Sequence, residues 1–175
     1  MDIIVTAGAT GVPRHRGVLR AGELVFDCAL GRAGIRADKR EGDGATPAGR
    51  FALREILYRA DRLDAPACRL RGRAIGREDG WCDDPAHADY NRAVRFPFAA
   101  GAERLWREDA LYDLVVVIGY NDDPPQAGAG SAIFLHVAKP DMGPTEGCVA
   151  LPMPDLLALV ARLAPDDRIV IGAAG

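Results

Sequence analysis

Residues 133–151 read IFLHVAKPDMGPTEGCVAL, and this stretch decides most of what the sequence says about the protein. Its first part is an apolar run typical of a buried strand, and that run carries His136 near its end. A loop rich in proline and glycine follows, and such a loop can reverse the chain. The stretch therefore predicts a strand, a reversing loop and a second apolar run, with Cys148 brought back beside His136.

A cysteine beside a histidine is suited to nucleophilic acyl transfer. A free thiol has a pKa of about 8.5, so only a few per cent is thiolate at neutral pH. His136 can take the thiol proton, leaving a thiolate–imidazolium pair, and can later return the proton to a leaving amine. Backbone N–H groups of Gly147 and Cys148 are the expected oxyanion donors, because glycine lets a carbonyl approach closely. We expect a backbone carbonyl, such as that of Val137, to orient the imidazole.

Each member of this pair also fits a structural role when it is taken alone. A histidine at a strand end is often a packed core residue, and a cysteine in an apolar setting is often inert. The glycine before Cys148 and the loop that joins it to His136 favour the catalytic interpretation. Cys28 lies in a strand-like run, and we expect it to be a small buried hydrophobe.

Bulk composition narrows the class of protein. The 175 residues predict a single domain, residues 1–175. With 22 basic and 25 acidic residues the formal charge is −3, so we expect no nucleic-acid partner. No apolar run approaches the ~20 residues of a membrane span, and the N-terminus does not resemble a signal peptide, which predicts a cytoplasmic location. Without a Cys-x-x-Cys pair we expect no metal and no organic cofactor.

Short strands dominate the predicted secondary structure. Apolar and alternating runs of strand length recur along the chain, and glycine or proline stands at nearly every junction. A helical stripe of apolar residues covers residues 155–163 and ends before Pro165. A weaker helix is predicted over residues 102–107. The fold class is therefore mainly β with a few short helices.

Two separated motifs resemble one known family. The pattern Thr145-x-Gly147-Cys148, preceded by a histidine on a strand, resembles the L,D-transpeptidase catalytic domain, also called the YkuD domain. Residues 39–51 read KREGDGATPAGRF, which is similar to the G-D-x-x-T-P-x-G-x-F stretch of that family. The resemblance runs from about residue 18 to residue 170.

The resemblance implies a fold and a chemistry. The fold would be a β-sandwich, and the reaction would be acyl transfer on peptidoglycan stem peptides or muropeptides. Cys148 would be the nucleophile that attacks the carbonyl of the third, diamino-acid residue and expels D-alanine. His136 would be the base, Val137 its orienting carbonyl, Gly147 the oxyanion glycine and Thr145 the signature hydroxyl. The family works on the cell wall, so the resemblance implies the periplasm or cell envelope rather than the cytoplasm.

Two positions depart from the family pattern. The residue before the glycine is Glu146 where the family usually has histidine, and Ala150 stands where it usually has arginine or asparagine. Only 11 residues separate His136 from Cys148. These differences leave the acyl acceptor and the exact substrate open, and we expect Thr145 and Glu146 to contact the substrate.

Aromatic and amide side chains on loops are further candidates for substrate binding. Trp81, Tyr90 and Asn91 belong to a long loop region, and Tyr120 and Asn121 follow the most apolar predicted strand. These groups suit a zwitterionic peptide. In the alternative interpretation, Trp81 and Tyr90 attach the loop to the domain, while Tyr120 or Asn121 merely ends a strand.

Three functions remain open from the sequence. The first is an L,D-transpeptidase that passes the acyl group to an amine. The second is an L,D-carboxypeptidase or cross-link hydrolase that passes it from the same acyl-enzyme to water. The third is a muropeptide-binding module without catalysis, which would need neither Cys148 nor His136. The oligomeric state is not predicted.

Overall fold

The computed structural model describes residues 1–172 and contains fourteen strands and one helix within that range. The elements are β1 (Asp2–Ala7), β2 (Arg16–Ala21), β3 (Leu24–Ala29), β4 (Ile35–Arg36), β5 (Thr46–Pro47), β6 (Gly49–Tyr58), β7 (Gly72–Ala74), β8 (Asp79–Cys82), β9 (Ala93–Arg95), β10 (Ala102–Arg104), β11 (Leu114–Ile118), β12 (Phe134–Val137), β13 (Val149–Leu151), α1 (Met153–Val160) and β14 (Arg168–Ile171). The mainly β class predicted from the sequence is confirmed.

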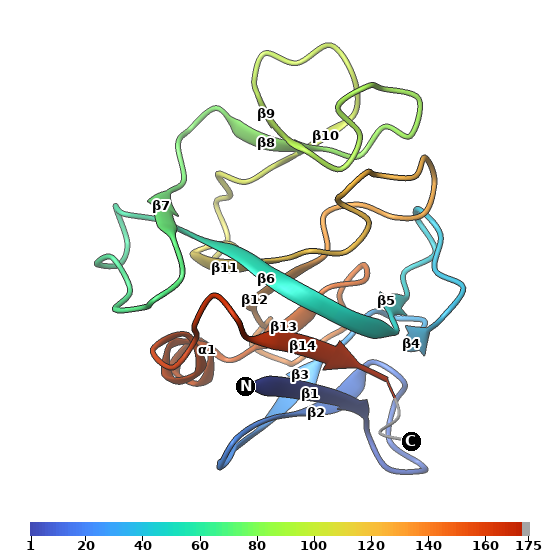
Figure 1. Cartoon of the computed structure of the whole chain (residues 1–175), viewed down its shortest axis with the longest axis vertical. Helices are drawn as coiled ribbons and strands as arrows, with labels where there is room; N and C mark the ends of the chain where they lie inside the picture. Colours follow the sequence, from blue (N-terminus) through green and yellow to red (C-terminus); the bar gives the residue numbers. More distant parts are fainter. Residues whose placement is uncertain (173–175) are drawn as a thin grey trace.

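The main sheet nearly surrounds one interior. Its nine strands follow the order β11-β12-β13-β3-β2-β1-β14-β6-β7, and β6 pairs a second time with β11, so that eight of them form a closed circuit. Figure 1 shows this circuit below and in the middle of the molecule, with α1 at one side. Closure satisfies the backbone groups that an open sheet would leave at its edges.

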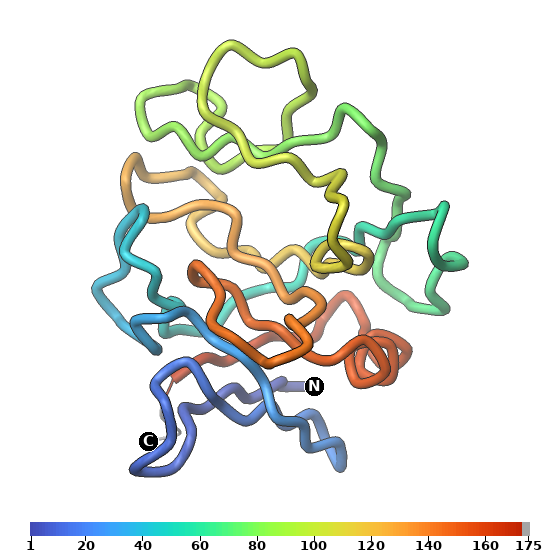
Figure 2. Tube along the Cα trace, turned by 180° about the vertical axis from the view of Figure 1, so that it is seen from behind, coloured from blue at the N-terminus to red at the C-terminus, as the bar shows by residue number. Residues whose placement is uncertain are grey.

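A smaller sheet stands apart from the circuit. Strands β10, β8 and β9 pair antiparallel in that order, and we call them the arm. The arm lies at the top of Figure 1, and Figure 2 shows from behind how long loops connect it to the rest of the chain. Most of the region predicted as long loops, residues 61–97, therefore builds the arm and its connections.

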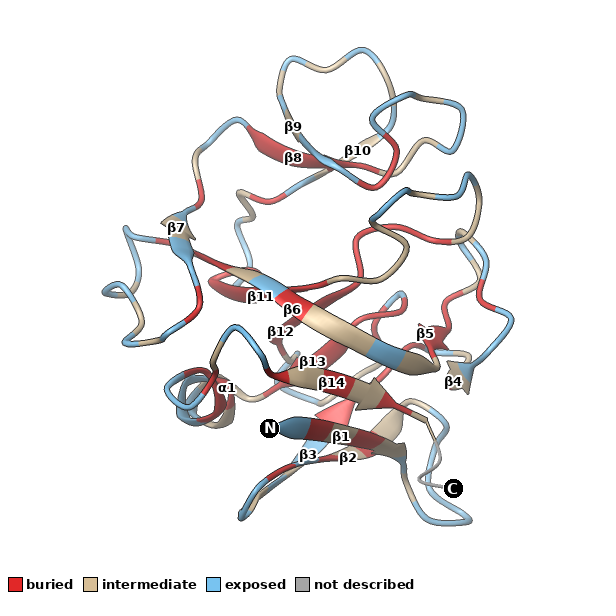
Figure 3. Ribbon diagram, in the orientation of Figure 1, coloured by how far each residue is buried: buried red, intermediate tan, exposed pale blue. Residues whose placement is uncertain are grey.

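Alternation along β11 and β12 directs side chains into two cores, one on each face of these strands. Leu114, Val116 and Leu135 face a first cluster, rich in Ile, Leu and Val, which we call the aliphatic core. Val115 and Phe134 face a second cluster, the aromatic core, which consists of Leu57, Ile75, Trp81, Leu105, Tyr112, Val115, Val117, Ala132, Phe134 and Cys148. Figure 3 shows both strands buried along their length. Strands covered on both faces read as continuous apolar runs, as β11 does.

Of the two predicted helices, one is present and one is absent within the described residues. The predicted helix at residues 155–163 is present as α1, which begins at Met153, has proline in its first turn and buries Leu156, Leu159 and Val160. Leu163 is also buried, but in the turn after the helix, and this is why it extended the apolar stripe.

The prediction of a helix at residues 102–107 is wrong. Ala102–Arg104 form β10, because Ala102 pairs with Cys82 and Glu103 pairs with Trp81 of the arm. Long-range strand pairing overrides a weak local preference for helix. Of the expected few helices, α1 is the one found within residues 1–172, and no helix of that range is long and apolar enough to cross a membrane.

Candidate active site

Neighbouring strands bring the predicted pair to one face of the sheet. β12 and β13 run parallel, with Leu135 opposite Val149 and His136 opposite Ala150. Cys148 directly precedes β13. Side chains alternate along a strand, so His136 and Cys148 project to the face opposite Leu135 and Val149. Both line a single cavity of about 490 Å³, which we call the catalytic cavity.

His136 is held in one tautomer by its neighbour in the chain. Its Nδ1 lies 2.8 Å from the carbonyl oxygen of Val137, the carbonyl expected from the sequence. A carbonyl oxygen only accepts, so Nδ1 carries the hydrogen and Nε2 keeps its lone pair. The ring of Tyr112 stands edge-on to the imidazole at 5.3 Å between centroids. Burial lowers the pKa of His136 to about 4, so the ring is neutral at neutral pH.

The thiol of Cys148 is fixed by two backbone groups, one at the start of β12 and one two residues before it. Sγ donates to the carbonyl oxygen of Ala132 at 3.2 Å and accepts from the N–H of Phe134 at 3.3 Å. Burial raises the pKa of Cys148 to about 12. The thiolate–imidazolium pair expected from the sequence is therefore disfavoured in the free protein, because desolvation acts against the charge on both partners.

Two threonines hold the backbone of the nucleophile. The carbonyl oxygen of Cys148 accepts from Thr145 Oγ1 at 2.7 Å and from Thr46 Oγ1 at 3.4 Å. Thr46 Oγ1 in turn accepts from the N–H of Gly31 at 2.8 Å. Because Thr46 belongs to the first sequence motif and Thr145 to the second, these hydroxyls explain physically why the two motifs occur together.

Only glycine fits immediately before the nucleophile. Gly147 has φ of +140°, and a Cβ there would lie 2.7 Å from the backbone oxygen of Ala45. Its N–H donates to Thr145 Oγ1 at 3.2 Å. Gly147 thus lets two segments of backbone touch, and in the free protein its N–H is occupied by the threonine.

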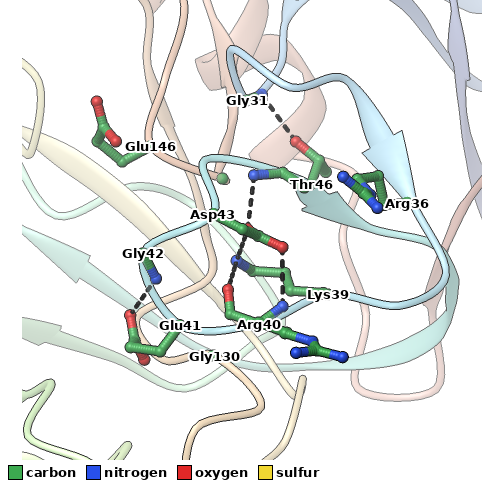
Figure 4. A network of polar contacts seen from close by, with 12 residues as sticks. Gly31, Arg36, Lys39, Arg40, Glu41, Gly42, Asp43, Thr46, Gly130 and Glu146 are labelled. Carbon is green, nitrogen blue, oxygen red and sulfur yellow. Dashed lines mark hydrogen bonds and ion pairs between the residues drawn. The ribbon is translucent and has the colours of Figure 1, made fainter.

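The first motif is organised around one carboxylate. Asp43 accepts from Lys39 Nζ, from the Arg40 N–H and from the Ala45 N–H, each at 2.8 Å (Figure 4). Lys39 is buried against this loop and is one of the charges that favour ionisation of Cys148, although burial of the thiol outweighs it. The motif therefore holds the Lys39–Asp43 ion pair in a loop close to Cys148.

The departures from the family pattern lie at the catalytic cavity. Glu146 is mostly exposed, lines the cavity and forms an ion pair with Arg32. Ala150 lines the cavity on the strand that carries the nucleophile and contributes no polar group. Thr145 lines it too, with its hydroxyl engaged by the backbone of Cys148.

The other predicted binding residues lie outside the catalytic cavity. Trp81, Asn91 and Tyr120 line a second cavity of about 530 Å³ on the other side of Ile133 and Phe134. Trp81 Nε1 donates to Asn91 Oδ1 at 2.9 Å, and Tyr120 OH donates to the Ala129 carbonyl at 2.6 Å.

Tyr90 and Asn121 support the loop that precedes β12. Tyr90 OH donates to Glu41 and accepts from the Gly130 N–H at 2.9 Å. Asn121 Nδ2 donates to the carbonyls of Gln126 and Gly130. The contacts of Tyr90 attach its loop to the domain, as in the structural alternative, whereas Asn121 does more than end a strand. Substrate binding by any of the five residues stays a prediction.

Several residues of the catalytic cavity were missed in the sequence, and three of them lie on β10 of the arm or in the segment that follows it. Glu103, Arg107 and Tyr112 line the cavity, and Tyr112 OH donates to Glu103 Oε1 at 2.7 Å. Burial raises the pKa of Glu103, and the hydrogen bond from Tyr112 opposes that shift. No local pattern marks these residues, because they reach the cavity only when the arm folds over the circuit of strands.

A family model and one solved structure are similar to this chain. The model of the L,D-transpeptidase catalytic domain (YkuD) matches residues 10–171. A crystal structure of L,D-transpeptidase 1 from Mycobacterium tuberculosis is similar over 98% of this chain and 59% of its own, with 11% sequence identity and a TM-score of 0.41. A search of curated proteins found no match. The chain thus spans about three fifths of the length of that solved relative.

Proposed function

Because the chain belongs to the L,D-transpeptidase catalytic-domain family over residues 10–171, we propose that it is a cysteine-dependent acyltransferase acting on peptidoglycan stem peptides. The observation that carries the proposal is the orientation of His136. Its Nδ1–H is engaged by the Val137 carbonyl at 2.8 Å, so Nε2 is left to accept a proton in the cavity that also contains the Cys148 thiol. A base with its lone pair fixed beside a nucleophile is what acyl transfer requires.

In the first step Sγ of Cys148 attacks the carbonyl carbon of the third residue of the stem peptide. The thiol proton passes to Nε2 of His136 as the S–C bond forms, because burial disfavours separate charges before the attack. The tetrahedral intermediate then breaks its C–N bond, and the imidazolium gives the proton to the departing D-alanine nitrogen. A thioester remains on Cys148.

In the second step an amine of another stem peptide attacks the thioester carbon. Its proton passes to Nε2, the C–S bond breaks, and the thiolate recovers a proton from the imidazolium. Water in place of the amine would give an L,D-carboxypeptidase or cross-link hydrolase with the same acyl-enzyme.

Backbone N–H groups supply the expected stabilisation of the oxyanion. The N–H of Cys148 and that of Gly147 are the proposed donors. Gly147 donates to Thr145 in the free protein at 3.2 Å, so this donor becomes available only when substrate displaces the threonine hydroxyl.

The charges around the cavity support a zwitterionic substrate. Glu41, Asp83 and Glu103 bring negative charge to it, and Arg107 and Lys139 bring positive charge. The end of a stem peptide carries a free ammonium on its diamino acid and a terminal carboxylate, so both signs can be matched.

Mass spectrometry of the protein incubated with a disaccharide-tetrapeptide tests the proposal. We expect loss of D-alanine and a thioester adduct on the protein, and neither with Cys148→Ala. Cross-linked dimers would identify a transferase, and a tripeptide product would identify a hydrolase. A folded protein that binds the muropeptide without forming an adduct would instead be a binding module, and the proposed catalysis would be wrong.

A further inference from the structure

Asn91 lies outside the catalytic cavity, yet its side chain uses its whole hydrogen-bonding capacity. Oδ1 accepts from Trp81 Nε1 at 2.9 Å and from the Ala132 N–H at 3.0 Å. Nδ2 donates to the carbonyls of Tyr120 at 2.9 Å and of Asn121 at 2.7 Å. A carboxamide has two acceptor and two donor positions, and here all four are filled in a side chain that is buried.

The bond from Ala132 to Asn91 reaches the nucleophile through one residue. Ala132 donates its N–H to Asn91 Oδ1, and its carbonyl oxygen accepts from Cys148 Sγ at 3.2 Å. Ala132 also has φ of +52°, a left-handed conformation that a residue with a Cβ adopts rarely. Such a conformation persists where surrounding contacts hold it, and the hydrogen bond to Asn91 is one of those contacts.

The support is itself anchored to the arm. Asn91 follows β8 and precedes β9, and its N–H donates to the Cys82 carbonyl at 2.9 Å. Its φ of +56° is one that asparagine tolerates better than most residues. Trp81 packs edge-on against Phe134 with 5.2 Å between ring centroids, so the arm contacts the strand of His136 at a second point.

We infer that Asn91 is a positioning residue, which holds the backbone N–H of Ala132 and so fixes the conformation that points the Ala132 carbonyl at the Cys148 thiol in the catalytic cavity. The inference rests on the proposed function for its effect on turnover. Asn91 acts through Ala132 and lies outside the cavity where the substrate is proposed to bind. The arm thus holds the Cys148 thiol in one orientation and keeps it protonated and shielded from water until substrate binds.

Asn91→Gly is the decisive variant, because glycine keeps the positive φ while removing the amide. Without the amide, the Ala132 N–H loses its acceptor and the left-handed conformation of Ala132 can relax, so its carbonyl turns away from the thiol and the thiol meets water. We expect kcat for D-alanine release to fall roughly tenfold with little change in KM. We expect alkylation of Cys148 by iodoacetamide at pH 7 to become several-fold faster, with the midpoint of its pH profile shifted down.

Two further variants separate positioning from general loss of stability. Trp81→Phe keeps an aromatic ring against Phe134 but removes one donor to Asn91, so we expect a smaller change in the same direction. Val160→Ala opens a cavity in the aliphatic core on α1 and should lower the melting temperature while leaving the alkylation profile of Cys148 as in the wild type.

The outcomes are distinct. Faster alkylation with slower turnover in Asn91→Gly, absent from Val160→Ala, would support the inference. Wild-type alkylation and wild-type kcat in a folded Asn91→Gly protein would overturn it, as would an equal alkylation shift in Val160→Ala. Should Asn91→Gly fail to fold, Trp81→Phe decides by the same two measurements. If the wild type released no D-alanine but the alkylation profiles still differed, the positioning role would stand and the proposed substrate would be wrong.

Discussion

Cys28 and Cys148 lie in the two cores of the same molecule and differ in almost everything except burial. Both are buried, and burial raises the pKa of each thiol to about 12. Cys28 packs in the aliphatic core, where a Cβ on Gly17 would lie 3.1 Å from its sulfur. Cys148 belongs to the aromatic core, contacts two polar backbone groups and opens on the catalytic cavity. A raised thiol pKa therefore does not separate a nucleophile from a packing residue, whereas a cavity and a neighbouring base do.

Replacing each cysteine by alanine gives the largest expected contrast. Cys148→Ala should abolish the release of D-alanine, a loss of roughly 10⁶ in kcat where a nucleophile is removed. Cys28→Ala should keep kcat and lower stability by about 1 kcal/mol, since one sulfur is lost from a packed core. Mass spectrometry of products and thermal unfolding of both variants measure the two effects. Complete loss of activity in a folded Cys28→Ala protein would mean that the wrong cysteine had been chosen.

His136→Ala tests whether His136, whose ring packs against Tyr112 of the aromatic core, is the base. We expect kcat to fall by roughly 10²–10⁴, the range of general acid–base catalysis, because Nε2 would no longer accept the thiol proton. Alkylation of Cys148 by iodoacetamide should also be slower near neutral pH. The alkylation rate of the wild type and of His136→Ala, measured against pH, tests this. The same measurement on Cys28→Ala shows whether Cys28 contributes to the observed alkylation. An unchanged profile would exclude His136 as the base.

Protonation of His136 should make the free energy of unfolding depend on pH in the acid range. Its pKa is about 4 in the folded protein because of burial, and about 6.5 in the unfolded chain. Between these pH values the unfolded state binds a proton that the folded state does not, so stability falls as pH falls from 6.5 to 4. The loss is roughly 3 kcal/mol and levels off below pH 4.

Urea unfolding at several pH values measures this slope. His136→Gln should flatten it, because a neutral side chain cannot take up the proton. Cys28→Ala should keep the slope, since the change lies in the aliphatic core. A slope that persists in His136→Gln would assign the titration to another group.

The sequence could predict that the central residues of the candidate site lie together, because they are close in the chain. His136, Val137, Thr145 and Cys148 fall within one strand–loop–strand unit, and the period of two places the imidazole and the thiol on one face. The contact from Thr46 crosses the fold, but it was indicated by the resemblance of both motifs to one family.

The rim of the site depends on tertiary folding, and there the sequence was a poor guide. Residues 102–107 predicted a helix, yet Glu103 lies on β10 and meets Tyr112 at the cavity. Asn91 was predicted to bind substrate because of its residue type. In the structure, backbone groups and Trp81 Nε1 fill all four hydrogen-bonding positions of its amide. Strand pairing within the arm decides the position of Glu103, and the contacts of the arm with the strand circuit decide that of Asn91. No local pattern encodes these long-range contacts.

The smallest expected effect is that of Glu103 on β10 of the arm, whose negative charge acts on the pKa of Cys148. Burial is the main cause of the raised pKa of Cys148, and the negative charge of Glu103 raises it further. Glu103→Gln removes that charge but keeps an oxygen to accept from Tyr112 OH. We expect the pH midpoint of Cys148 alkylation to move down by a fraction of a unit, with the fold unchanged.

Glu108→Gln supplies the matched control for Glu103→Gln, because Glu108 carries the same charge on the exposed surface and does not line the catalytic cavity. Its alkylation profile should match the wild type, since solvent screens exposed charges. If Glu103→Gln raised the midpoint, or if both variants moved it equally, the arm would not act on Cys148 through this carboxylate. If the alkylation midpoint moved only in Glu103→Gln, a charge on the arm would act on the thiol in the aromatic core. Nothing comparable is expected for Cys28 in the aliphatic core.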